Sequence, residues 1–216
     1  MEDAPWAMQL AVRLERRQPP THSAVCAAAA MAVVRVLTEP DPGWREAVGQ
    51  WEAGRIRKVT RRARGVRWAA VQTLPGVTVE HAGAEVRAFV PGPVTEVPPE
   101  LAKLQVAGLD LTDGAADDDD QAGEPLPPYA AVALNPDVPM STGKAAAQSG
   151  HAAHLLLRQA AESGRSAWLA AGLCVHLVRA QTWRRCVERA TVAVRDAGFT
   201  EVPPGTVTAI AWLVLT

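Results

Sequence analysis

The stretch NPDVPMSTGKAAAQSGHAAH, residues 135–154, decides how the rest of the chain is interpreted. It follows a strand-like run, Tyr129–Leu134, and changes at Ser-Thr-Gly-Lys from a proline-containing loop to an alanine-rich helix. Lys144, Gln148 and His151 stand four and three residues apart, so their side chains share one helical face near the N-terminus. The N–H groups and positive dipole end there suit a phosphate or an oxyanion. The stretch therefore predicts a polar site at the start of a helix.

The dipeptide Gly143-Lys144 also occurs in phosphate-binding P-loops, but its surroundings exclude one. A P-loop requires a glycine five residues before Gly143, where Val138 stands. It also requires a serine or threonine after the lysine, where Ala145 stands. The sequence therefore argues against a P-loop kinase or GTPase.

A second polar block lies at residues 194–208, VRDAGFTEVPPGTVT. Asp196 follows an apolar strand and precedes Ala-Gly. It could orient or deprotonate water, pair with Lys144, or only close an Asx turn. Thr200 and Thr208 could hydrogen-bond an ester or a water, although threonine is also simply common in strands. The two blocks together supply a cation, a carboxylate and hydroxyls.

In this order, the GKxAAQxxHAA and Asp-Ala-Gly motifs resemble the type II peptidyl-tRNA hydrolases. The resemblance implies a mixed four-stranded sheet with helices on both faces. It also implies hydrolysis of the ester between a peptide and the ribose of tRNA, with neither a cofactor nor a metal. His151 either buttresses the site or is a core histidine satisfied by one hydrogen bond. The catalytic residues that the resemblance implies are Lys144, Asp196, Thr200, Gln148, Thr208 and His151.

The same plan of strands and helices occurs twice along the chain. An internal duplication explains this most simply, and each copy follows the order strand, helix, helix, strand, helix, strand, strand. In the second copy the first helix is expected over Thr142–Glu162. The matching segments are Gln9–Leu14 with Tyr129–Leu134, His22–Leu37 with Thr142–Leu157, and Trp68–Gly83 with Trp183–Gly198.

We therefore predict an α/β protein built of two copies of a small mixed four-stranded sheet flanked by helices, packed as an internal pseudo-dimer. The first half, residues 1–111, is expected to be a degenerate copy of the hydrolase domain. Residues 112–128 form an acidic, proline- and glycine-rich linker, and the second half, residues 129–216, is the catalytic domain. The tail of the first half, residues 91–111, has room for a short helix and a final strand that the second half lacks.

The first half has lost most polar groups of the motif. The alignment sets His22 and Cys26 opposite the lysine and the glutamine, and His81 opposite the aspartate. The first half instead carries a basic stripe, which could contact a tRNA backbone or could be a solvated face. The residues of the basic stripe are Arg55, Arg57, Lys58, Arg61, Arg62, Arg64 and Arg67.

The chain contains no apolar run long enough to span a bilayer. Cys26, Cys174 and Cys186 follow no metal-ligand pattern and fit a reducing compartment, so we expect a cytoplasmic protein without a membrane partner. We expect it to act on peptidyl-tRNA, or on N-blocked aminoacyl-tRNA, as a monomer shaped like a dimer. The alternatives are a non-catalytic tRNA- or RNA-binding protein of the same fold and a protein-interaction module.

Overall fold

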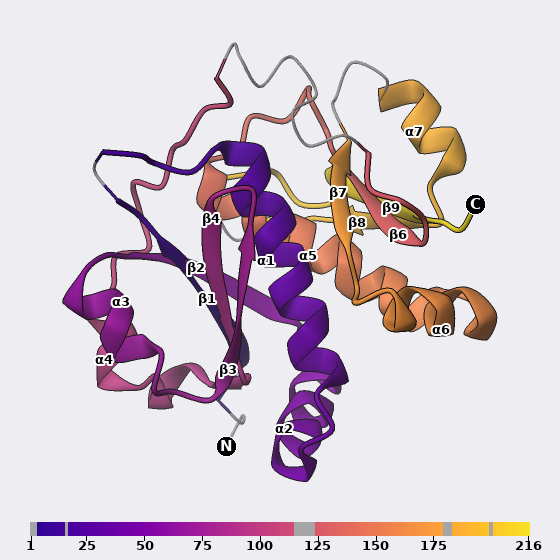
Figure 1. Ribbon diagram of the computed structural model, residues 1–216. Coiled ribbons are helices and arrows are strands. Elements are labelled where there is room, and N and C mark those ends of the chain that lie inside the picture. Colours follow the sequence, from indigo (N-terminus) through magenta and orange to yellow (C-terminus); the bar gives the residue numbers. More distant parts are fainter. Residues whose placement is uncertain (1–3, 16, 115–123, 179–182, 199–200) are drawn as a thin grey trace.

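Helices and strands alternate along both halves of the computed structural model (Figure 1), which describes residues 4–15, 17–114, 124–178, 183–198 and 201–216. The elements of the first half are β1 (Trp6–Arg13), α1 (His22–Thr38), α2 (Pro42–Glu52), β2 (Arg57–Ala63), α3 (Val66–Val71), β3 (Gly76–His81), β4 (Ala84–Phe89), β5 (Gly92–Pro93), a 3₁₀ turn (Val94–Glu96) and α4 (Pro99–Ala102). Those of the second half are β6 (Tyr129–Leu134), α5 (Thr142–Gln159), α6 (Glu162–Ala170), β7 (Val175–Val178), α7 (Trp183–Arg189), β8 (Val192–Arg195) and β9 (Val207–Val214).

The two halves build sheets with the same strand order. The first sheet runs β2-β1-β4-β3 and the second runs β7-β6-β9-β8. In each sheet the first pair of strands is parallel and the other pairs are antiparallel. The first sheet also receives the two-residue strand β5, which pairs with β1. The predicted α/β class with two mixed four-stranded sheets is confirmed, and the repeated order is consistent with a duplication.

A buried tryptophan fixes the start of the second strand in each half. The indole of Trp51, near the end of α2, donates to the carbonyl of Arg57 at 3.2 Å. The indole of Trp168, in α6, donates to the carbonyl of Cys174 at 2.8 Å. Both indoles are fully buried, so each needs such an acceptor. The same device therefore positions β2 in one half and β7 in the other.

The two halves meet along α1 and α5, which pack against each other in the middle of the molecule (Figure 1). The packing is reciprocal, because α1 also contacts β7 and α5 also contacts β2. Small side chains allow the close approach: a Cβ at Gly150 would lie 3.0 Å from Cγ2 of Val33. One apolar core accordingly runs through both halves. This exchange of contacts is the arrangement of an isologous dimer within a single chain.

The tail of the first half departs from the prediction of a final strand. It contains β5 at its start and the short helix α4, and beyond them the described residues make only an isolated bridge between Arg62 and Gln105. Gly108, at φ +73°, then turns the chain away from the sheet. The prediction of a final strand was wrong because the segment after Gln105 bonds to a helix start and does not continue the pairing with β2.

The end of this tail and the first residues of the linker bind the N-terminal turns of both central helices. The carbonyl of Leu109 accepts from the N–H of Gly143 at 3.2 Å, at the start of α5. The carboxylate of Asp113 accepts from the N–H and the hydroxyl of Ser23, at 2.8 and 2.7 Å, at the start of α1. These bonds satisfy donors that a helix start otherwise leaves to water.

Helix α5 is shorter than predicted. It ends at Gln159 because Ala160 adopts an extended conformation, with φ −62° and ψ 143°. Glu162, the expected last residue, instead begins α6.

Within the described residues, no single helix has the length and apolar composition to cross a membrane. Helices α1 and α2 meet that criterion only as a pair, with a bend of 112° between them.

Candidate active site

Three neighbouring elements of the second half position the polar side chains that the sequence singled out. Helix α5 begins after Ser141, whose hydroxyl accepts from the N–H of Lys144 at 3.2 Å. Asp196 directly follows β8, and Thr208 lies near the start of β9. Since α5 packs across both strands, these side chains meet beneath the first turns of the helix.

Lys144, Gln148, Asp196 and Thr208 form one continuous hydrogen-bonded chain. The ammonium of Lys144 donates to Oδ2 of Asp196, and Nε2 of Gln148 donates to the same oxygen at 2.7 Å. The hydroxyl of Thr208 donates to Oε1 of Gln148 at 2.8 Å. The structure thus brings together four of the six side chains that the sequence predicted to be catalytic.

A β-bulge turns Thr208 toward the helix. Val194 pairs with Ala209, but Arg195 pairs with Val207, so Thr208 is the extra residue of β9. Bulges of this kind re-aim a side chain and are common next to active sites. Thr208 is completely buried as a result, and its hydroxyl serves Gln148 from below.

The carboxyl of Asp196 is held ionised. Burial alone would raise its pKa, but the hydrogen bonds from the Lys144 ammonium, the Gly198 N–H and the Gln148 amide outweigh that effect. The pKa of Asp196 is therefore below its usual value. A carboxylate with a depressed pKa is a weak base near neutral pH, so this one is better suited to hold a cation than to remove a proton.

The turn after Asp196 requires glycine. Gly198 has φ +79°, and its N–H donates to Oδ1 of Asp196 at 2.8 Å, which closes an Asx turn. A Cβ on Gly198 would lie 2.7 Å from Cδ of Pro204. The Asx-turn interpretation and the pairing with Lys144 are therefore both correct for Asp196, because each uses a different oxygen.

Two backbone amides at the start of α5, where the sequence predicted an anion site, already have acceptors within the chain. The amide of Gly143 donates to the tail, and that of Lys144 donates to the capping residue Ser141. Ser141 itself donates to the carboxylate of Glu201 through its N–H at 2.9 Å and its hydroxyl at 2.7 Å. No sequence pattern links Glu201 to this helix. Within this helix start, the cation that faces the cleft is the Lys144 side chain.

The site opens into a cleft of about 910 Å³ that both halves line. The second half contributes Lys144, Gln148, His151 and Asp196. The first half contributes residues 54–60, which lead into β2 and form its first strand positions. The constellation therefore faces the first half across the cleft.

His151, the fifth predicted residue, bonds to the first half. Its Nδ1 lies 3.1 Å from Nζ of Lys58. Burial, followed by the charge of Lys58, lowers the pKa of His151 well below its usual value. The imidazole is therefore neutral near pH 7, and it connects α5 to β2.

Lys58 also lies 3.3 Å from Nδ1 of His154, whose Nε2 lies 2.6 Å from Oε1 of Glu52. The ring of His154 stacks on Trp51 with centroids 5.2 Å apart. This polar cluster crosses the boundary between the halves, and the separate sequence blocks gave no signal of it.

The basic stripe divides into three groups in space. Arg55, Arg57 and Lys58 line the cleft. Arg61 donates to Gln9 and to the carbonyl of Leu104, and Arg62 donates to the carbonyl of Gly108, so these two hold the tail. Arg64 and Arg67 are exposed at the far end of β2. Contact of the stripe with tRNA stays a prediction.

Thr200, the sixth predicted residue, lies outside the described residues. In the part of the chain that the structure covers, no group of three or more His, Cys, Asp or Glu side chains is arranged to hold a metal ion.

Comparison with known proteins agrees with this geometry. The family model described as Peptidyl-tRNA hydrolase PTH2 matches residues 130–213, which is almost the whole second half. A peptidyl-tRNA hydrolase from Pyrobaculum aerophilum is 36% identical over 93 residues, covering 37% of this chain and 78% of that protein. The chain therefore belongs to the PTH2 family of peptidyl-tRNA hydrolases.

Proposed function

We propose that this protein hydrolyses the ester bond of peptidyl-tRNA, or of N-blocked aminoacyl-tRNA, and releases free tRNA and peptide. The observation that carries the proposal is the Lys144–Asp196 pair at a cleft, joined to Gln148 and Thr208, within the segment that matches the family. The relative from Pyrobaculum aerophilum is named for the same activity.

Lys144 is the group that we assign to the reacting carbonyl. Its side chain is 12% exposed at the cleft, which leaves it accessible to a substrate while most water is excluded. As water adds to the ester carbonyl, negative charge develops on the oxygen, and a positioned cation stabilises it most effectively at such a site. The bond between the carbonyl carbon and the ribose oxygen then breaks, and a proton from the water ends on that ribose oxygen.

Asp196 orients both the cation and the water in this scheme. A carboxylate offers about four acceptor positions, and Lys144, Gln148 and Gly198 fill three of them. The remaining position can accept a hydrogen bond from the attacking water. The depressed pKa supports this orienting role over direct deprotonation.

Gln148 and Thr208 act as positioning residues. Both are almost completely buried, and each already bonds to another residue of the site, so we assign them to positioning and not to contact with the ester. Thr208 fixes the amide of Gln148, and that amide fixes the carboxylate. The role of Thr200 as a further hydroxyl at the site stays a prediction.

The test is release of tRNA from N-blocked aminoacyl-tRNA by the purified full chain. The wild type is expected to release it, and Lys144→Ala to lower the rate by about one hundredfold or more, in the range measured when an oxyanion-stabilising group is removed. Lys103→Ala is the matched control, because Lys103 is an exposed lysine on the outer tail. If the folded wild type binds tRNA but does not hydrolyse the aminoacyl ester, the RNA-binding alternative is supported. If it does not bind tRNA at all, the protein-interaction alternative is supported.

We further propose that the protein acts as a cytoplasmic monomer, with domains at residues 1–111 and 129–216 joined by 112–128. The reciprocal packing of α1 and α5 supports this, because it already covers the surface that a separate subunit would need. Sedimentation of the purified chain measures the oligomeric state.

A further inference from the structure

We propose that the first half, although it lacks the catalytic side chains, supplies one wall of the active-site cleft, and that Arg55 and Arg57 in this wall bind phosphodiester groups of the single-stranded 3′ end of the RNA. The inference rests on the proposed function for the position of the ester. It adds the binding site for the strand that carries that ester.

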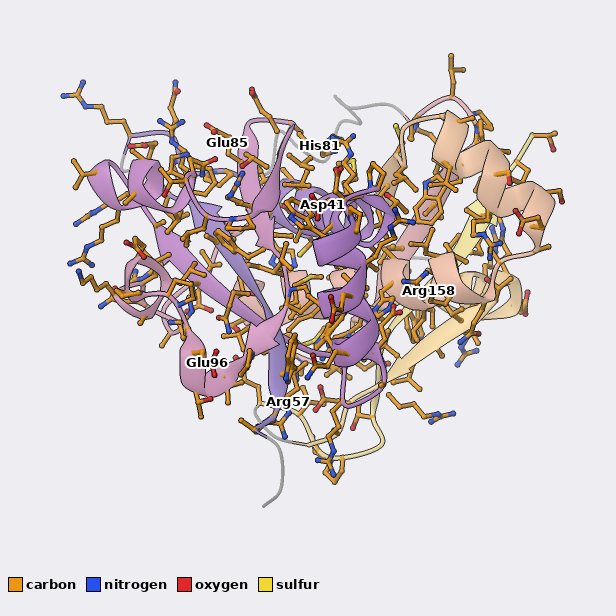
Figure 2. All side chains as sticks on the ribbon, turned by 90° about the horizontal axis from the view of Figure 1, so that it is seen from below. Asp41, Arg57, His81, Glu85, Glu96 and Arg158 are labelled. Carbon is orange, nitrogen blue, oxygen red and sulfur yellow. The ribbon has the colours of Figure 1, made fainter. Side chains whose placement is uncertain are left out.

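The packing places this wall opposite the reacting groups. Helix α5 contacts β2, so the residues that begin β2 face the helix that carries Lys144. Arg55 and Arg57 line the same cleft as Lys144 and Asp196. Arg57 lies at one side of the molecule and His81, the first-half counterpart of Asp196, lies at the opposite side (Figure 2). The contribution of the first half therefore comes from β2 and not from its own degenerate site.

The charge of the cleft favours a polyanion. Its lining includes the cations Arg55, Arg57, Lys144 and Arg195, against the carboxylates of Asp196 and Glu201. Both carboxylates have partners of their own, since Asp196 binds Lys144 and Glu201 accepts from Ser141. An excess of cations in a concave site raises the local concentration of an anionic ligand, and arginine forks match the geometry of phosphate oxygens.

Lys58 keeps this wall at a fixed position. Its Nζ lies between the Nδ1 atoms of His151 and His154, at 3.1 and 3.3 Å, and 4.7 Å from the centroid of the Trp51 ring. These contacts anchor the first residues of β2 to the helix of the other half. The two arginines close to this anchor are thereby held at a set distance from the ester site, which suits a strand with regularly spaced phosphates.

The experiment compares two pairs of substitutions on the same stripe. Arg55→Gln with Arg57→Gln removes the cleft pair, and Arg64→Gln with Arg67→Gln removes an exposed pair outside the cleft lining. Each protein is assayed with N-blocked aminoacyl-tRNA, with a minimal 3′-acyl-adenosine ester, and for binding of uncharged tRNA over a range of salt concentrations. Thermal melting checks the fold, and Arg55→Gln alone, at an exposed side chain, provides a second variant with little risk to stability.

Substitution of the cleft pair is expected to raise KM for the tRNA substrate about tenfold or more, the size expected for one charge-assisted hydrogen bond. The value of kcat, and the rate with the minimal ester, should stay unchanged. The slope of log affinity against log salt should become shallower by about 0.7 for each single-strand phosphate that an arginine no longer binds. Substitution of the exposed pair should change KM by no more than about twofold, because its charges are screened from the cleft by salt.

Equal effects of the two pairs, or an unchanged KM in the folded cleft variants, would overturn the proposal. The binding measurement separates this outcome from a failure of the proposed function. If the wild type does not hydrolyse the ester, and only substitution of the cleft pair weakens tRNA binding, the RNA-binding wall is supported and the proposed hydrolase activity is contradicted. If the wild type and all variants hydrolyse the tRNA ester equally well, the hydrolase activity is supported and the RNA-binding wall is contradicted.

Discussion

The first and second halves place a glycine of positive φ at corresponding positions, but only the second attaches chemistry to the residue two places before it. Gly83 follows His81-Ala with φ +77°, and Gly198 follows Asp196-Ala with φ +79°. The pairing of β3 with β4 runs without a break to His81, whereas β8 and β9 have a bulge just before Asp196. The glycine of positive φ is therefore common to both halves, while the bulge belongs to the site, because it directs the hydroxyl of Thr208 at the helix.

The helix starts differ in the same sense. Thr21 caps α1 by accepting from Ala24 N–H at 3.2 Å, as Ser141 caps α5. Counted from these caps, Ala24 and Ala28 stand at the positions of Lys144 and Gln148. The sequence alignment had set His22 and Cys26 there, two residues earlier, because a comparison of alanine-rich segments has no fixed reference point. In either alignment, the first half has neither a lysine nor a glutamine at the positions that match Lys144 and Gln148.

Separating the halves should have the largest effect. Residues 129–216 expressed alone would expose the faces of α5 that now contact α1 and β2, and such an apolar surface favours unfolding or self-association. We expect an unstable or aggregating product by circular dichroism and light scattering, with recovery when residues 1–111 are added. A stable, fully active monomer of 129–216 would make the first half an independent appendage.

Substitution of Asp196 and of its first-half counterpart, His81, should show which of the two positions is needed for activity. Asp196→Ala is expected to lower the rate of ester hydrolysis by about one hundredfold or more, because the Lys144 ammonium loses its anchor and the water its acceptor. His81→Ala should leave the rate nearly unchanged. Single-turnover assays of both proteins measure this difference, and comparable losses would contradict a single site in the second half.

The glycines two places after these residues give a smaller, structural comparison. Alanine at a positive φ costs about 1–2 kcal/mol, and this should be the whole cost of Gly83→Ala, since nothing lies within 4 Å of the added Cβ. Gly198→Ala also crowds Pro204, at 2.7 Å, so we expect a total loss of about 2–4 kcal/mol. Urea denaturation of the two variants provides the measurement, and equal losses would show that the turn at Pro204 yields without cost.

The last comparison concerns the pH dependence of stability at the boundary between the halves. Burial, and then the charge of Lys58, lowers the pKa of His154 to about 3, although Glu52 opposes the shift. The unfolded chain binds that proton near pH 6.5, so stability is lost as the pH falls from about 6.5 towards 3, by up to about 1.4 kcal/mol per pH unit.

His154→Gln should flatten this decline between pH 7 and 5 in urea titrations. Counted from the helix caps, Val34 of α1 is the equivalent of His154. Because valine does not titrate, this position of the first half adds nothing to the pH dependence of stability. An equally steep decline in the variant would place the titration at other groups, such as His151.

Local patterns predicted the elements of the second half well. The strand Tyr129–Leu134 has the expected bounds, and α5 begins at Thr142, because alternation and capping act over a few residues. The spacing of Lys144 and Gln148 on one face was also a local property. Their meeting with Asp196 followed from the family resemblance, and the hydrogen bonds are in place.

The rest depended on contacts between distant residues that no local pattern encodes. Lys58 and His151 are 93 residues apart, and Ser141 and Glu201 are 60 apart. A final strand was wrongly predicted for the tail for the same reason. The carbonyl of Leu109 bonds to the start of α5, and the carboxylate of Asp113, just beyond the tail, bonds to the start of α1. The docking of the halves brings Lys58 to His151 and Leu109 to Gly143, whereas the contact of Ser141 with Glu201 forms within the second half.

The contact of Lys58 with α5 also has a consequence for which domains could pair with the second half. The indoles of Trp51 and Trp168 donate to the carbonyls of Arg57 and Cys174, which are therefore equivalent positions. The next residues, Lys58 and Val175, are then counterparts of each other. If the second half paired with a copy of itself, a valine would face His151 and His154, and two buried imidazole nitrogens would lose their donor. The two halves are therefore not interchangeable at this boundary, because the histidines of the second half depend on a lysine that only the first half supplies.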